Sequence, residues 1–80
     1  MTRATVRWFS DEEGWGVLDT PEAPDGVFVH FGAIEMDGYQ TLAAGQVVDV
    51  ELEGPLAQPL EIEEDQSFRF SAKRVQPISS

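Results

Sequence analysis

Two short aromatic clusters are the residues of this sequence whose types and spacing point most directly to chemistry. The first runs from Arg7-Trp8-Phe9 into Gly14-Trp15-Gly16-Val17, and the second is Val27-Phe28-Val29-His30-Phe31. Both alternate like β-strands, so that ring side chains recur on one face of a sheet. Aromatic rings on such a face stack on unpaired nucleobases, at about 1 to 3 kcal/mol per base. The sequence therefore predicts a nucleobase-stacking face.

The charge of the chain opposes that function. It has 15 acidic and 5 basic residues, a net charge of −10 and a pI near 4.1. This balance argues against anionic membrane surfaces and against the salt-dependent duplex binding that basic stripes provide. Fields decay over about 8 Å at physiological ionic strength, so only acidic residues near the rings, above all Glu13, should weaken binding. We expect stacking-driven binding with weak affinity and a shallow salt dependence.

The sequence gives little support for disulfides, metal binding, catalysis or a phosphate-binding loop. The chain lacks cysteine, which excludes disulfides and thiolate metal sites. His30 is the single histidine, so we interpret it as a stacking or hydrogen-bonding ring. The acidic runs 11–13 and 63–65 read as solvated surface, and Gly14 and Gly16 lack the spacing of a phosphate-binding loop. We predict no enzymatic activity, no catalytic residue, no metal site and no cofactor.

The elements that must position the rings are short strands. Eighty residues fit one domain over 1–80, with a core from about 4 to 76. The segment 32–42 reads as irregular, with Ala33–Met36 long enough only for one turn of helix. The segment 54–66 reads mostly as a long loop, in which Leu60 and Ile62 could extend a strand edge. Five short strands separated by glycine- and proline-rich turns favour an all-β, five-stranded antiparallel barrel over a sandwich. The expected strands are Thr5–Phe9, Trp15–Asp19, Val27–Phe31, Val48–Glu53 and a last one from Phe68, with a bulge before Val75.

Strand alternation assigns the side chains to two faces. One patch of rings is expected outside the barrel, made of Trp8, Trp15, Phe28 and His30, while Phe9 and Phe31 fall inside by the same parity. Antiparallel pairing brings such residues within contact distance of one another. The expected interior is Val6, Leu18, Val27, Val29, Val48, Val50, Leu52, Phe68 and Phe70.

These motifs give the chain a family resemblance. It resembles bacterial cold-shock domain proteins over Val6 to Val75. Arg7-Trp8-Phe9-Ser10 stands for the family's Lys-Trp-Phe-Asn, Gly14-Trp15-Gly16-Val17 for Lys-Gly-Phe-Gly-Phe, and Val27-Phe28-Val29-His30-Phe31 is unaltered. Two further stretches match, at Asp37-Gly38-Tyr39 and Gly45-Gln46-Val47-Val48. The resemblance implies an OB-fold that binds single-stranded RNA or DNA, as an RNA chaperone or a regulator of transcription or translation.

The resemblance also implies which residues form the site. The family's binding positions fall on Arg7, Trp8, Phe9, Trp15, Val17, Phe28, His30, Phe31 and Tyr39. Three departures stand out: Glu13 replaces the family's lysine, Val17 its second motif phenylalanine and Gly26 its aspartate. Arg7 keeps a positive charge that can pair with phosphate or stack.

One alternative function stays open at this point. A cold-shock fold with little nucleic-acid affinity would engage a basic protein through its aromatic face or through the acidic loop Gly54–Gln66. The absence of a secretory signal, of a run of about 20 apolar residues and of cysteine favours a cytoplasmic protein without a membrane partner. We expect a monomer, with a dimer not excluded.

Overall fold

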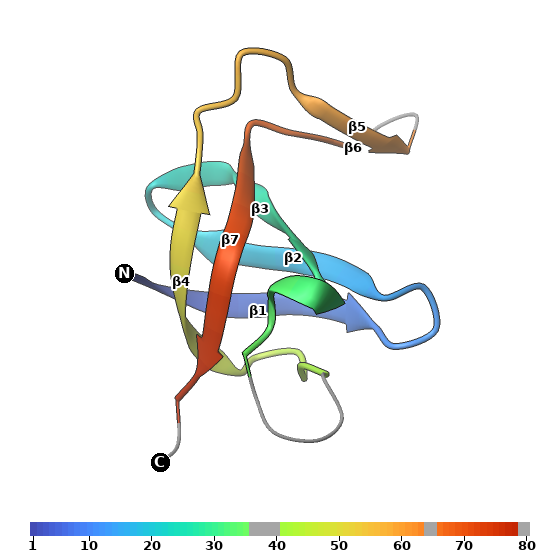
Figure 1. The fold of residues 1–80 in the computed structure, drawn as a ribbon, viewed down its shortest axis with the longest axis vertical. Helices are drawn as coiled ribbons and strands as arrows, with labels where there is room; N and C mark the ends of the chain where they lie inside the picture. Colours follow the sequence, from blue (N-terminus) through green and yellow to red (C-terminus); the bar gives the residue numbers. More distant parts are fainter. Residues whose placement is uncertain (36–40, 64–65, 79–80) are drawn as a thin grey trace.

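Five strands close a β-barrel in the computed structural model, which describes residues 1–35, 41–63 and 66–78. The order around the barrel is β1 (Thr2–Ser10), β2 (Trp15–Thr20), β3 (Ala23–His30), β7 (Phe70–Pro77) and β4 (Val47–Glu53). Figure 1 shows these strands wrapping around one another, with the N-terminus at the outside. The predicted all-β, five-stranded barrel is confirmed.

The strand pairings are antiparallel except where the barrel closes. β1 pairs with β2 and β4, β2 with β3, and β4 with β7, all antiparallel. β3 and β7 run parallel, with Val27 opposite Phe70 and Phe28 opposite Ser71. Strand directions cannot alternate all the way around a closed barrel that has an odd number of strands. At least one of the five pairings between neighbouring strands therefore has to be parallel, and we call the β3–β7 pairing the parallel seam. The expected antiparallel barrel therefore carries one parallel seam.

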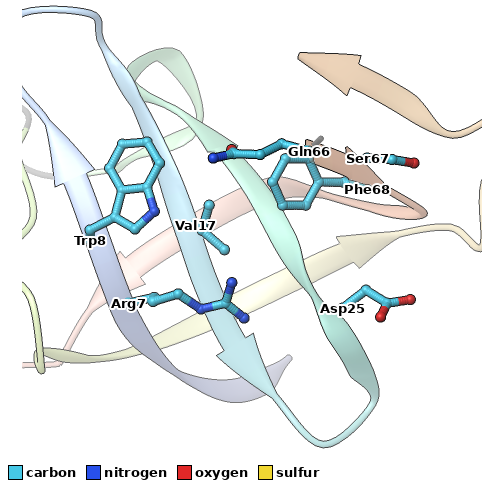
Figure 2. Close-up of a pocket in the computed structure, with 7 residues that line it drawn as sticks. All are labelled: Arg7, Trp8, Val17, Asp25, Gln66, Ser67 and Phe68. Carbon is cyan, nitrogen blue, oxygen red and sulfur yellow. The ribbon is translucent and has the colours of Figure 1, made fainter. Parts of the chain in front are cut away.

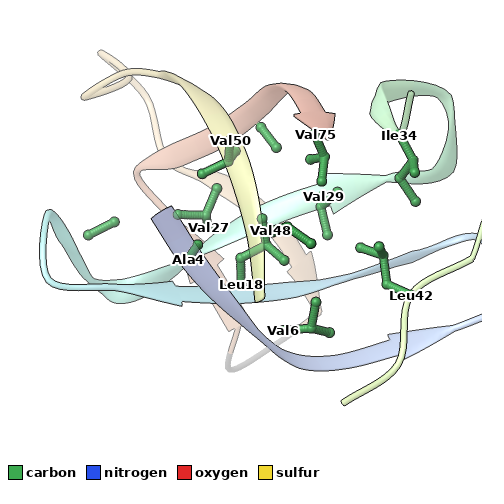
Figure 3. Close-up of a cluster of buried hydrophobic side chains, with 12 residues drawn as sticks. Ala4, Val6, Leu18, Val27, Val29, Ile34, Leu42, Val48, Val50 and Val75 are labelled. Carbon is green, nitrogen blue, oxygen red and sulfur yellow. The ribbon is translucent and has the colours of Figure 1, made fainter. Parts of the chain in front are cut away.

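Alternating apolar side chains fill the barrel. The interior cluster is almost entirely aliphatic, and Phe9, Leu52 and Phe70 pack against its edge. The register of the β4–β7 pairing shifts between the pair Glu51–Arg74 and the pair Leu52–Ala72. This shift leaves one extra residue on β7, so that Ala72 and Val75 both face the barrel interior. The predicted bulge before Val75 is confirmed. Figure 3 shows the cluster, which comprises Ala4, Val6, Leu18, Ala23, Val27, Val29, Ile34, Leu42, Val48, Val50, Ala72 and Val75.

A 3-10 turn, η1 (Phe31–Ala33), follows β3 directly. After it, Ile34 forms an isolated parallel bridge with Val75, and its side chain is fully buried in the barrel cluster. The backbone N–H of Glu35 donates to the Val75 carbonyl at 2.7 Å. The turn of helix expected from Ala33 onward is thus wrong, because the 3-10 turn lies earlier, at Phe31–Ala33, and Ile34 and Glu35 are bonded to β7 instead. Met36, the last residue of the expected turn, lies outside the described residues.

The segment 54–66 is more ordered than its composition indicates. β5 (Leu60–Glu63) and β6 (Gln66–Phe68) form a separate two-stranded antiparallel sheet, with Leu60 opposite Phe68. Figure 1 shows this β5–β6 hairpin extending from the end of the barrel beside β3. The predicted loop is confirmed for 54–59, and the strand expected as possible at Leu60 and Ile62 is present as β5. Leu60 and Phe68 pack against rings of the barrel and so hold β5 and β6 against it.

Candidate nucleic-acid interface

Four aromatic rings follow one another across neighbouring strands. Trp8 of β1 meets Trp15 of β2 edge to face at 4.7 Å between ring centroids, and Trp15 stacks on Phe28 of β3 at 5.6 Å. Phe28 meets Phe68 of β6 at 6.2 Å in a tilted arrangement. We call these four residues the ring series. The patch of rings expected from strand parity thus exists for Trp8, Trp15 and Phe28, and Phe68 extends it.

The ring series is more buried than expected. Trp15 is only 8% exposed, Val17 1% and Phe68 3%, and the three form a second cluster outside the barrel interior. Trp8, Phe28 and Leu60 pack against this cluster and remain half-buried. The expectation that Trp15 is an exposed ring is wrong. Its cluster is covered by Trp8 and Phe28 from the barrel and by Leu60 and Phe68 from the β5–β6 hairpin.

Phe68 also differs from its predicted place in the interior. The bend at Arg69 separates β6 from β7, so the alternation of Phe68, Phe70 and Ala72 is not that of one continuous strand. Phe70 and Ala72 stay with the barrel cluster, whereas Phe68 joins Trp15 and Val17. The expected interior position of Phe68 is therefore wrong.

His30 and Phe31 form a second, more exposed pair of rings. Their centroids lie 4.4 Å apart, His30 is exposed and Phe31 is 45% exposed. His30 lies opposite Trp15 in the β2–β3 pairing, which places the pair beside an inner member of the ring series. The His30 Nδ1 accepts a hydrogen bond from the backbone N–H of Gly32 at 3.2 Å. This bond needs an unprotonated Nδ1 and fixes the orientation of the ring.

Phe9 and Tyr39 complete the predicted set of site residues. Phe9 is half-buried and packs against the barrel cluster, as expected, so it does not join the ring series. The register irregularity between Val6 and Trp8 reverses the alternation of faces in β1, which lets Val6 and Phe9 both face the barrel interior. Tyr39 lies outside the described residues. The described candidate face is therefore built from Trp8, Phe28, His30 and Phe31, with Trp15 and Val17 beneath it.

Arg7, which lines one pocket together with Trp8 and Phe68, is already paired with an acidic residue. Arg7 Nε donates to Asp19 Oδ1 at 2.9 Å, and Arg7 Nη2 binds the same oxygen. This hydrogen bond raises the pKa of Arg7, so the guanidinium stays charged at any working pH. Both side chains remain nearly half exposed, and a pair in that setting is weak enough to exchange partners. Arg7 thus offers less free positive charge to a phosphate than its position alone predicts.

Glu13 lies in the turn that borders the exposed ring pair. Its backbone N–H donates to Ser10 Oγ at 3.1 Å, and its carboxylate-bearing side chain is exposed. The next residue, Gly14, has φ of +79° and accepts a hydrogen bond from the Phe31 N–H at 2.9 Å. A Cβ on Gly14 would lie 2.9 Å from the Phe31 ring, so the glycine permits this close approach. The inverted charge at Glu13 therefore belongs to the candidate site.

Gly26 and Val17, the two other departures from the family pattern, are in contact. Gly26 has φ of +100°, a conformation that favours glycine. A Cβ at Gly26 would lie 2.9 Å from Val17 Cγ1, 3.3 Å from Arg7 Nη2 and 3.5 Å from the Phe68 ring. Val17, Gly26 and Phe68 therefore share one space.

Phe68 is the member of the ring series that sequence reasoning missed. The available signal was the pair of apolar residues Leu60 and Ile62 followed by Phe68 across a short acidic turn, which has the spacing of a small hairpin. The adjacent acidic residues obscured this signal by making the segment resemble a solvated loop.

The closed five-stranded barrel with rings across β1, β2 and β3 defines a nucleic-acid-binding β-barrel of the OB type. The family model of the 'cold-shock' DNA-binding domain matches residues 2–59. The chain belongs to this family. The β5–β6 hairpin, from Leu60 onward, lies beyond the matched residues.

Individual relatives agree with the family assignment. The cold shock-like protein CspD of Vibrio cholerae is 47% identical over 57 residues, covering 69% of this chain and 74% of that protein. A cold shock-like protein of Thermotoga maritima is 42% identical over 66 residues, covering 78% and 98%. Cold shock-like protein CspLB of Listeria monocytogenes is 45% identical over 62 residues, covering 72% and 92%. Within the described residues, no helix has the length and apolar character needed to cross a membrane.

Proposed function

We propose that this protein binds single-stranded RNA or DNA by stacking bases on Trp8, Phe28, His30 and Phe31. The observation that supports this most is the run of ring contacts across neighbouring strands in the ring series. The exposed His30–Phe31 pair lies next to it, because His30 is the backbone partner of Trp15. Each stack contributes about 1 to 3 kcal/mol and is nearly indifferent to base identity. Trp15 and Val17 act as the support beneath the stacking rings.

The proposed binding depends little on salt. Within residues 1–35, 41–63 and 66–78, the basic side chains Arg3, Arg7 and Arg74 form ion pairs, with Asp49, Asp19 and Glu35 respectively. Each neutralised phosphate contributes about −0.7 to the slope of log K against log salt for single strands. A face that neutralises one or two phosphates should therefore give a slope between about −1 and −2, with lower affinity at low salt than a basic face would provide.

Titration with short oligonucleotides tests this proposal. RNA and DNA strands of the same pyrimidine-rich sequence are added at several salt concentrations while tryptophan fluorescence is followed. The expected result is binding with the shallow slope given above. A slope steeper than about −3, equivalent to at least four neutralised phosphates, would contradict the stacking model, and the absence of binding at low salt would refute the function.

Two substitutions locate the binding face. Trp8→Ala together with Phe28→Ala removes two half-buried rings and should abolish measurable binding, because each lost stack is worth about 1 to 3 kcal/mol. Val47→Ala is the matched control, since Val47 is an exposed apolar residue of β4 outside the ring series. Circular dichroism and the urea midpoint must show that the double variant remains folded. Wild-type affinity in a folded double variant would move the site elsewhere.

A further inference from the structure

Lys73 is the single lysine of the chain and belongs to β7, which carries none of the rings of the proposed binding face. We propose that Lys73 binds a phosphate of the single strand whose bases stack on Phe28 and on the His30–Phe31 pair. The inference rests on the proposed single-strand binding. It adds the residue that holds the backbone of the nucleic acid on the β7 side of that face.

The parallel seam places Lys73 between two fixed points of the barrel. Phe28 of β3 lies opposite Ser71, and Ile34 lies opposite Val75. Lys73 is two residues away from each of these β7 positions. The chain that faces Lys73 across the seam therefore runs from Phe28 to Ile34, and it includes the exposed ring pair. Figure 1 shows β7 passing next to η1, the turn that follows β3.

Strand geometry puts Lys73 on the same outer surface as Phe28. Val27 and Ala72 face the barrel interior, so the residue that follows each of them faces outward. Lys73 is exposed, and it lies about 7 Å along β7 from the residue opposite Phe28. The flexible four-carbon stem of lysine lets the ammonium cover such a distance. A phosphate next to a base on Phe28 is therefore within its reach.

The ammonium of Lys73 has no ion-pair partner to give up. Within residues 1–35, 41–63 and 66–78, the basic side chains that form no ion pair are Lys73 and Arg69. Glu51 and Glu53 of β4 are paired in register with β7 residues on either side of Lys73. Neither carboxylate lies within ion-pair distance of Lys73 in the part of the chain that the structure describes. A phosphate can thus bind Lys73 without displacing a carboxylate.

Arg7, on the β1 side of the same face, is less available to a phosphate. Two of its nitrogens bind Asp19. Figure 2 shows its guanidinium in a pocket that Asp25 also lines. A phosphate at Arg7 would have to compete with one carboxylate and would lie near a second one. Lys73 therefore binds phosphate with the smaller loss of existing contacts.

The salt dependence of binding tests this assignment. Lys73→Gln and the wild type are titrated with the pyrimidine-rich oligonucleotides described above. Loss of one phosphate contact should make the log-log slope shallower by about 0.7, so the advantage of the wild type should shrink about 2.6-fold between 50 and 200 mM salt. Lys73→Arg should keep the wild-type slope. Arg3→Gln is the matched control, because it removes the same charge at the β1–β4 pairing and should also keep that slope.

Chemical modification locates the contact without a substitution. An N-hydroxysuccinimide ester of acetic acid acetylates the Lys73 ammonium group, once deprotonated, and the α-amino group at the N-terminus. Mass spectrometry of peptides measures the two rates separately. Saturating oligonucleotide should slow the acetylation of Lys73 and leave that of the α-amino group unchanged.

The outcomes separate this inference from the proposed function. An unchanged slope in Lys73→Gln, an equal change in Arg3→Gln, or acetylation of Lys73 that the oligonucleotide does not slow would each overturn the phosphate contact alone. A shallower slope in Arg69→Gln but not in Lys73→Gln would give the contact to Arg69 and overturn it as well. Absence of oligonucleotide binding by the wild type would overturn the proposed function and this inference with it.

Discussion

Replacing Val17 with the family's phenylalanine should destabilise this protein, although the change moves the sequence toward its relatives. Val17 is 1% exposed and lies against Phe68 and Gly26. A buried site filled this closely resists a larger side chain, at a cost of about 1 to 3 kcal/mol. Phe68→Ala alone should cost about 3 kcal/mol, the lower end for a buried phenylalanine, because the hairpin at the edge of the fold can relax.

The two substitutions should offset each other when combined. If the phenylalanine at position 17 fills the space that Phe68→Ala vacates, the double variant should lose about 1 to 3 kcal/mol less than the sum of the single losses. Urea unfolding followed by tryptophan fluorescence measures each free energy of unfolding, and unchanged m-values would show that the compared states expose similar surface. Val17→Phe with Leu52→Ala is the control, since Leu52 packs against the barrel cluster. If the loss of unfolding free energy in the double variant of Val17→Phe with Phe68→Ala equals the sum of the two single losses within about 0.5 kcal/mol, the two side chains do not share one space.

Three further changes have defined outcomes. Asp19→Asn releases Arg7 from its ion pair, so affinity at low salt should rise and the salt slope should steepen by about 0.7; an unchanged slope would show that Arg7 does not reach phosphate. Glu13→Lys reverses the charge in the turn beside the ring pair and should steepen the slope similarly, measured by the same titration. The pKa of Glu35 is lowered by hydrogen bonds from Gln76 and Arg74, so its stabilisation is complete above the ordinary value of 4.5 and disappears as pH falls through the lower folded value. Glu35→Gln should therefore flatten the acid dependence of the unfolding midpoint, by a small amount because the group is exposed.

Local patterns predicted the barrel because each barrel strand has one apolar face. The alternation of Val48 and Val50 with acidic residues, and of Val27 and Val29 with Phe28, gave the inward side chains correctly. Even the bulge before Val75 follows from a break in that alternation. A two-residue period is a direct consequence of strand geometry, so it can be read without knowing the partners.

The candidate site was predictable only in part, because burial on the outer face depends on contacts distant in sequence. Parity placed Trp15 outside the barrel correctly but could not show that Phe68, on another sheet, packs into the same cluster. The packing of Phe68 into this cluster also explains why β5 and β6 pair with each other despite the acidic residues around them. Engagement of a basic protein by this segment stays a prediction, as do the roles of the individual stacking residues.

The parallel seam between β3 and β7 has a consequence for the motions of the barrel. Only two residue pairs register along this seam, and they join opposite halves of the chain, so closing it costs more loop entropy than forming either neighbouring hairpin. The seam should therefore be the last part of the barrel to form and the first to exchange its amide hydrogens with solvent. Because Phe28 belongs to this seam, a single-stranded nucleic acid stacked on its ring would bind where the closed sheet opens most easily. The bound nucleic acid would therefore slow the opening of the whole barrel.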